Sequence, residues 1–356
     1  MATGLLGHKV ADLCLGKPAL RSLSVASGSV GDALAALNSG EDAAISVWSC
    51  DHSPGGENIG AGGCVCIGKI CMVDIISYLC KVQEEEENLS SPSNSLGLAL
   101  AAPLSVLLSQ IPGPIPIRHV QPSSSIVEAI DLMAQGVQNL VVPIERVRSS
   151  SRRKFVLQKK TPSTITTIHN AQEFCWLTQE DVMRYLLGSI GLFSPLPALS
   201  IHALGVIAAD FPAVGYHSPA SSALKAIHRS LADQTSVAVV DDDGVLIREI
   251  SPSALAACDE TLAAAVAALS AGELMAYIDG NSSSSQSLRM SRRAGAIVCH
   301  PGSSLAAVMI QAIANRVNYV WVIEDDWSLV GIVTFSNILR VFRQYLEESQ
   351  TSTSSL

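Results

Sequence analysis

Sulfur and imidazole side chains are the residues of this sequence whose types could do chemistry, because a thiolate is both a nucleophile and a metal ligand. The chain contains nine cysteines and eight histidines. Cys71 stands where a helix is predicted to begin, a position that can lower the pKa of a thiol and make it a redox sensor. The alternative is structural: Cys64, Cys66, Cys71 and Cys80 lie in apolar segments, where cysteine packs as a small hydrophobic side chain.

His52, Cys64 and Cys66 are the residues that could act together as zinc ligands. A Cys-x-Cys pair along a strand, however, only places two side chains on one face of that strand. We therefore predict no metal site.

Catalytic motifs are missing from the sequence. It has no glycine-rich phosphate loop, no Gly-x-Ser-x-Gly and no His-Glu-x-x-His, and its histidines are scattered. We expect no enzyme and no required cofactor.

Charge and hydropathy exclude two classes of partner. Charged residues make up 15% of the chain and the net charge is −9, so we expect no binding to nucleic acid. The longest apolar stretch, from Leu96 to Leu108, contains Pro103 and is too short to span a bilayer, so we expect no membrane insertion. The odd cysteine count and the absence of an export signal predict a reducing location, the cytoplasm or the nucleus.

One basic stretch, residues 146–160, interrupts this acidic sequence and includes Ser149 to Ser151. Such a stretch is either a solvated loop or a docking loop that phosphorylation could order.

Four segments of the chain align with one another and predict the elements that position these side chains. Three of the four segments begin at a proline: Pro122, Pro219 and Pro301. All four carry a serine in one shared column: Ser29, Ser125, Ser222 and Ser304. Because apolar residues follow at helical spacing, each segment predicts a helix, and after each proline the serine is its predicted N-cap. A β-rich run follows each helix, then a turn or insertion, a second apolar run and a closing helix near Cys71, Thr178, Ser251 and Thr334.

The predicted fold is α+β: four β-α-β-β-α units that pair, because one small sheet cannot cover both of its faces. The first module spans 1–190, with units at about 10–82 and 104–190. The second spans 191–356, with units at about 198–277 and 290–346.

This element order, with a Ser/Thr-x-x-Asp motif opening the closing helix, resembles the CBS domain, two copies of which form a Bateman module. The resemblance is most specific from Val322 to Leu339. The run from Ala11 to Ser24 is similar to the plant CBSX group, which in turn resembles γ subunits of AMP-activated and sucrose-non-fermenting-related kinases.

In the CBS family, adenine nucleotides lie in clefts between paired repeats, and the Asp of the closing helix accepts hydrogen bonds from ribose. The resemblance implies ligand-binding roles for Asp74, Thr178, Asp181, Thr334 and Asn337. Ala254 has no acceptor, and Asn337 lacks the charge that strengthens such a bond. The alternative for Thr178 and Asp181 is a helix cap that needs no ligand.

The family also places a basic residue before the middle strand to meet phosphates. The matching positions here are uncharged or acidic: Asp42–Ala43, Gln138–Asn139, Thr235–Ser236 and Val317–Asn318, with Arg316 the nearest basic side chain. Phosphate binding would then rest on helix N-termini and backbone amides.

The resemblance implies a non-catalytic regulatory protein that senses AMP, ADP, ATP or an adenosyl ligand. Its partner would be a catalytic or scaffold subunit of a protein kinase, and a homodimer is compatible with the fold. Two alternatives remain open: an interaction scaffold that has lost the ligand, and a thioredoxin-linked redox regulator that acts through Cys71.

Overall fold

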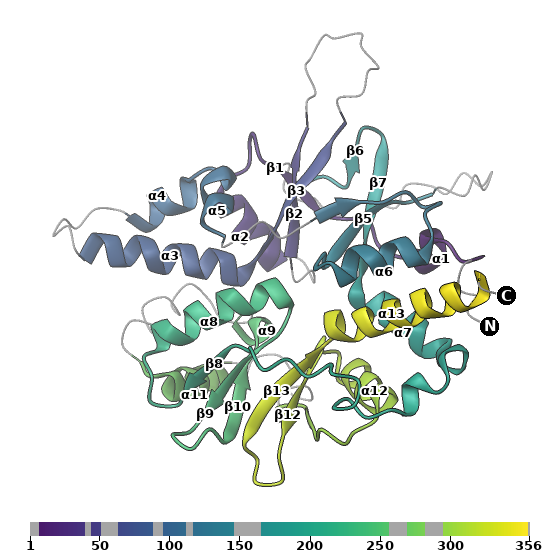
Figure 1. The fold of residues 1–356 in the computed structure, drawn as a ribbon. Helices are drawn as coiled ribbons and strands as arrows, with labels where there is room; N and C mark the ends of the chain where they lie inside the picture. The colour runs from purple at the N-terminus through teal and green to yellow at the C-terminus, as the bar shows by residue number, and fades with distance from the viewer. Residues whose placement is uncertain are drawn as a thin grey trace. The chain divides into compact units, whose positions relative to one another are not determined.

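The chain alternates short strands and helices in the computed structural model, which describes residues 7–39, 44–50, 63–87, 95–111, 117–145, 165–255, 269–281 and 295–354 (Figure 1). The strands of these described residues form four small sheets, three with three strands and one with four. One sheet belongs to each predicted repeat, which confirms the α+β class and the repeated unit.

The first repeat contains α1 (Val10–Leu13), β1 (Ser22–Ser24), α2 (Val30–Ser39), β2 (Ala44–Ser49), β3 (Val65–Cys71) and α3 (Met72–Glu87). β1 runs parallel to β2, and β2 runs antiparallel to β3. Two short helices follow, α4 (Ser95–Ala101) and α5 (Leu104–Gln110). They are separate helices because Pro103, the N-cap of α5, interrupts the apolar run.

The second repeat contains β4 (Ile117–His119), α6 (Ile126–Ala134), β5 (Asn139–Pro143), β6 (Ile168–His169), β7 (Gln172–Thr178) and α7 (Gln179–Gly188). Its strands are ordered β4-β5-β7-β6, so β6 adds a fourth strand at the edge. The 3-10 helices η2 (Ile190–Phe193) and η3 (Leu196–Ala198) lead out of it.

The third repeat contains β8 (Ala213–Gly215), α8 (Ala220–Asp233), β9 (Val237–Val240), β10 (Leu246–Ile250), α9 (Pro252–Leu255) and α11 (Ala271–Asn281). The fourth contains β11 (Val298–Cys299), α12 (Leu305–Asn315), β12 (Tyr319–Ile323), β13 (Leu329–Thr334) and α13 (Phe335–Ser354). Each sheet joins a parallel and an antiparallel pair, as in the first repeat.

Equivalent main-chain hydrogen bonds pair the repeats. Ala11 N–H donates to Pro122 O at 2.9 Å, and His202 N–H donates to Pro301 O at 3.1 Å. Two of the aligned prolines therefore stand in the same setting. Further along, Leu20 N–H donates to Phe174 O and Ala208 N–H to Ile332 O, both at 2.8 Å. The first repeat thus pairs with the second, and the third with the fourth.

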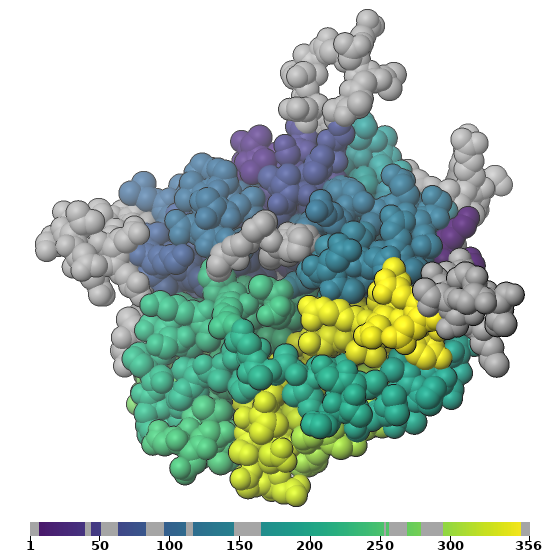
Figure 2. Space-filling model, in the orientation of Figure 1, coloured from purple at the N-terminus to yellow at the C-terminus, as the bar shows by residue number. Residues whose placement is uncertain are grey.

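Contacts between Cα atoms divide the chain into two compact units. One contains Lys9–Ser124 and Leu140–Leu177. The other contains Met1–His8, Ser125–Asn139 and Thr178–Leu356, so it includes α6 and α7 of the second repeat. Within this second unit α13 contacts α6 and α7, and the yellow surface of α13 lies against the blue-teal surface of α6 in Figure 2. The module boundary at residue 190 stays a prediction from the repeat pairing.

The helix that follows the first strand of each repeat buries one apolar face at helical spacing. In α6 the buried residues are Ile126, Ala129, Ile130 and Met133, and in α12 they are Leu305, Val308, Met309 and Ala312. This spacing of three and four residues puts all four on one side of each helix. No helix of the described residues combines the length and the hydropathy needed to cross a bilayer.

Of the three predicted serine caps, those at Ser125 and Ser304 are confirmed, and Ser29, for which no cap was predicted, caps its helix in the same way. Ser29, Ser125 and Ser304 each accept a hydrogen bond from the N–H three residues on. The prediction for Ser222 is wrong, because α8 begins earlier with Pro219 as its N-cap. There the N–H of Ala220 donates to Leu269 O at 2.9 Å, so a carbonyl from a distant segment satisfies the start of the helix.

Several predictions fall outside the described residues and are not assessed: the basic loop 146–160, His52, and the positions Asp42 and Ala43.

Candidate functional site

A capping box fixes the start of α7 at two of the predicted site residues. Thr178 is the N-cap, and its Oγ1 accepts from the Asp181 N–H at 3.3 Å. In return Asp181 Oδ2 accepts from the Thr178 N–H at 2.7 Å and from its hydroxyl at 2.6 Å. These bonds satisfy donors that a helix start otherwise leaves open, so the capping role is present without any ligand.

The start of α13 repeats this geometry with an amide in place of the carboxylate. Asn337 Oδ1 accepts from both the N–H and the hydroxyl of Thr334, and Thr334 Oγ1 accepts from the Asn337 N–H at 3.2 Å. An amide oxygen therefore closes the same box, without the negative charge.

The two boxes are neighbours. Buried Gln179, which follows Thr178, donates through Nε2 to Ser336 Oγ at 2.9 Å, and Ser336 stands between Thr334 and Asn337. Two helix N-termini, each with a partial positive charge, thus meet beside one carboxylate and one amide. The structure brings four of the five predicted residues together here.

Asp74, the fifth predicted residue, lies in the other compact unit. It occupies the first turn of α3 and is only 3% exposed. Its Oδ2 accepts from the Cys71 N–H at 2.7 Å, which again caps the helix.

Lys69 is a charged residue near Asp74 that sequence reasoning missed. Burial lowers the pKa of the Lys69 ammonium, while the nearby side chains of Cys71 and Asp74 raise it. Its Nζ lies 6.0 Å from the centre of the Trp176 ring. Because Lys69 precedes the closing helix rather than the middle strand, the family's phosphate positions gave no signal for it.

Of the two interpretations of Cys71, the structure favours the packed side chain over a thiol with a lowered pKa. Burial raises the pKa of its thiol, and the charge of Asp74 raises it further. The thiol therefore stays protonated near neutral pH, which weakens the redox interpretation of this residue.

The third repeat lacks a carboxylate at the closing helix, as expected. Ser251 Oγ accepts from the Ala254 N–H at 3.1 Å, and the alanine side chain offers no acceptor. At the predicted phosphate positions Gln138, Asn139, Thr235 and Ser236 are buried, whereas Arg316 is exposed.

A polar network joins the third and fourth repeats. Glu249 accepts from the Tyr319 hydroxyl at 2.8 Å and from Trp321 Nε1 at 2.6 Å. The Tyr319 oxygen also lies 2.6 Å from Ser236 Oγ. Burial raises the pKa of the Glu249 carboxyl, although the bonds from Trp321 and Tyr319 act in the opposite direction.

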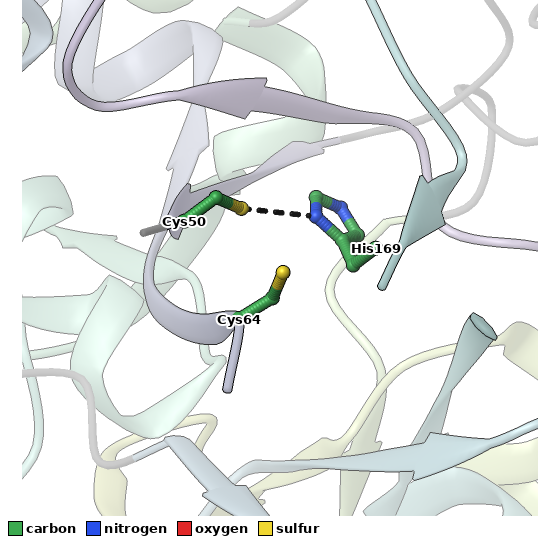
Figure 3. A group of neighbouring side chains, drawn as sticks. All are labelled: Cys50, Cys64 and His169. Atoms are coloured by element: carbon green, nitrogen blue, oxygen red, sulfur yellow. Dashed lines mark hydrogen bonds between the residues drawn. The ribbon is translucent and has the colours of Figure 1, made fainter. Parts of the chain in front are cut away.

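A cluster of two thiols and an imidazole involves none of these helix-start residues. Cys50, Cys64 and His169 have ligand atoms within 4.8 Å of one another (Figure 3). Sequence reasoning named Cys64 but missed Cys50 and His169. Cys66, its expected companion, is buried, and its sulfur lies 3.5 Å from Gly68 O. The hairpin register could have indicated Cys50, but nothing local indicates His169.

Comparisons with known proteins agree with this architecture. The family model of the CBS domain matches residues 288–344. The chain is 44% identical to CBS domain-containing protein CBSX5 of Arabidopsis thaliana, over 98% of this chain and 99% of that protein. It is 21% identical to the SNF1-related protein kinase regulatory subunit gamma-like PV42b of the same plant, over 96% of each chain.

Among solved structures, the chain resembles protein MJ1225 of Methanocaldococcus jannaschii, described as a candidate archaeal homologue of the AMPK γ subunit. The TM-score is 0.61 at 14% identity, over 94% of this chain and all of that one. The repeats and their pairing thus define a protein of tandem Bateman modules. The chain belongs to the CBS-domain proteins, and within them to the regulatory type represented by the CBSX and AMPK γ-like proteins.

Proposed function

We propose that this protein is a non-catalytic regulator whose CBS repeats bind an adenosine-containing ligand and thereby change its association with a protein kinase. The observation that carries the proposal is the pair of capping boxes joined by Gln179 and Ser336. In the CBS family the Asp of such a box receives the ribose hydroxyls. The kinase, of the SNF1-related type, is inferred from the relative PV42b.

Asp74 and Lys69 form a second candidate binding site for the same class of ligand. A carboxylate accepts two ribose hydroxyls well, and an ammonium group attracts a phosphate. Both side chains belong to the same compact unit, and their charges act on each other. Ligands with phosphates would therefore prefer Asp74 and Lys69, whereas the boxes of α7 and α13 would favour a nucleoside or adenosyl ligand.

Titration calorimetry of the full chain with AMP, ADP, ATP and adenosine tests the proposal. Asp181→Asn is the informative variant, because Asn337 shows that an amide still closes the capping box. We expect it to weaken adenosine binding by about 10- to 100-fold, the loss of one charge-assisted hydrogen bond, with unchanged circular dichroism. Asn337→Asp is the reciprocal variant and should strengthen binding.

The variant Lys69→Met distinguishes binding at Asp74 and Lys69 from binding at the capping boxes of α7 and α13. It should weaken AMP and ATP binding and leave adenosine binding unchanged. Absence of heat from all four ligands at millimolar concentration would refute ligand sensing.

An interaction scaffold without a ligand is the second candidate function. It is favoured by Ala254, which has no acceptor, and by the network of Ser236, Glu249, Tyr319 and Trp321, whose polar groups already satisfy one another. A scaffold would bind its partner equally well with Asp181 and with Asn at this position, whether or not adenosine is present.

A further inference from the structure

The hairpin of β2 and β3 places two thiols side by side at its open end. Cys50 directly follows β2 and Cys64 directly precedes β3, while the last residues of the ladder, Ser49 and Val65, are paired partners. The register therefore makes the two cysteines face each other. Both residues are half-buried rather than fully buried.

His169 comes from β6 of the second repeat and is held in one orientation. Its ring stacks on Trp48, with centroids 3.8 Å apart and planes at 9°. His169 is buried, and its Nδ1 lies 3.3 Å from Cys50 Sγ. Figure 3 shows this nitrogen directed towards the two sulfur atoms.

Ser22 fixes which ring nitrogen of His169 carries the proton. The Ser22 hydroxyl donates to Thr166 O at 2.7 Å, and the same oxygen lies 2.7 Å from His169 Nε2. A serine hydroxyl has one hydrogen, so it must accept from Nε2–H. In the neutral ring Nδ1 then carries the lone pair, and a partner on the distal nitrogen is the arrangement typical of histidine metal ligands.

We propose that Cys50, Cys64 and His169 form a binding site for a zinc ion. Two sulfurs and one imidazole nitrogen are ligands that Zn²⁺ prefers, and a site with three protein ligands leaves the fourth position to a solvent molecule. With Zn–S of about 2.3 Å and Zn–N of about 2.0 Å, tetrahedral ligand atoms lie roughly 3.5 to 3.8 Å apart. The mutual separations here, all within 4.8 Å, require only side-chain adjustment.

Binding balances in protons and charge. Each thiol releases its proton to solvent as its sulfur bonds to the ion, and Nδ1 donates its lone pair without losing a proton. Two thiolates neutralise the double charge of Zn²⁺, so no net charge is left in the site.

The ion would join the β2–β3 hairpin of the first repeat to β6 of the second. This role goes beyond ligand sensing and does not depend on it, because none of the three residues belongs to the capping boxes or to the surroundings of Asp74.

Titration of the reduced full-length protein with Co²⁺, followed by displacement with Zn²⁺, tests the site. We expect one equivalent of Co²⁺ to produce a thiolate-to-cobalt charge-transfer band that Zn²⁺ removes. We also expect Zn²⁺ to raise the Tm, because an ion that binds only the folded state stabilises it. Cys50→Ser and Cys64→Ser should lose both responses, whereas Cys14→Ser, which removes a half-buried thiol outside the cluster, should keep them.

Ser22→Ala keeps every ligand and removes the hydroxyl that bonds both His169 Nε2 and Thr166 O. It should weaken Zn²⁺ binding by about 10- to 100-fold, which also provides a test if a cysteine variant fails to fold. Absence of saturable binding to the wild-type protein, or the same binding in the Cys50→Ser and Cys64→Ser variants, would overturn the proposal.

Discussion

The Glu249 carboxylate belongs to a hydrogen-bond network. The other members of this network, Ser236, Tyr319 and Trp321, are buried. A phenol has one hydrogen, so Tyr319 donates to Glu249 and accepts from Ser236 when the carboxyl is ionised. Because burial raises the pKa of Glu249, the folded state holds this proton more tightly than the unfolded chain does. The residue therefore couples the stability of the fourth-repeat sheet to pH.

We predict that Glu249→Gln changes the pH dependence of unfolding. In the wild type, the contribution of Glu249 to the free energy of unfolding is complete below its unfolded-state pKa and is lost as pH rises through its higher folded-state pKa. The variant cannot titrate there. Its stability relative to the wild type should rise with pH over this interval and then level off.

Urea denaturation across the acidic range measures this difference. Other carboxyl groups titrate in both proteins and cancel in the comparison. A relative stability that is flat, or that falls with pH, would contradict the assigned pKa direction.

At the scale of elements, local chemistry predicted much of the repeated unit. The β-rich runs lie in strands, as at Tyr319–Ile323, because β-branched and aromatic side chains favour a half-buried pleated surface. Ser304 was predictable as an N-cap because its acceptor acts three residues away. The start of α8 was not, since Leu269 O, which is remote in sequence, satisfies the first N–H.

The candidate sites also contain some residues that local sequence predicts and others that only the tertiary fold brings together. Thr178 and Asp181 could be found because the family motif is contiguous, whereas the tertiary fold alone brings Gln179 to Ser336 and Cys50 to His169. Lys69 was missed because its place in β3 has no counterpart among the family's phosphate positions. Residue spacing along the chain does not predict contacts between such distant segments.

Because Ser304 caps its helix and Ser222 does not, replacing each by alanine should change the free energy of unfolding by different amounts. Ser304→Ala should lower the free energy of unfolding by about 0.5 to 2 kcal/mol, because the Ala307 N–H loses its acceptor. Ser222→Ala, at an exposed position inside the first turn of α8, should change it by less than about 0.5 kcal/mol. Chemical denaturation measures both, and equal losses would contradict the assigned helix start.

At the scale of the whole molecule, repeats pair through a close approach of main chains. Ala208 and Ile332 exchange hydrogen bonds of 2.8 and 3.0 Å, joining the third repeat to β13 of the fourth. Gly331 lies beside this contact, and a Cβ there would stand 2.9 Å from Ala208 O and collide with Ile207. The pairing therefore depends on the missing side chain.

Gly331→Ala should lower the free energy of unfolding by about 1 to 3 kcal/mol, because backbone must move to admit the methyl group. Gly302→Ala is the matched control, since a Cβ there meets nothing within 4 Å. If both variants unfold at the wild-type urea concentration, the repeats do not pair through this contact.

Regulation requires that ligand and partner each bind one arrangement of the modules better than another, so each must change the affinity for the other. The most direct measurement is the Kd of the full chain for the SNF1-related kinase catalytic subunit, with and without saturating adenosine, for the wild type and Asp181→Asn. The account predicts that adenosine shifts the wild-type Kd by about 5- to 150-fold and that the variant largely loses this shift. A Kd that adenosine leaves unchanged in the wild type, or shifts equally in both proteins, would contradict it.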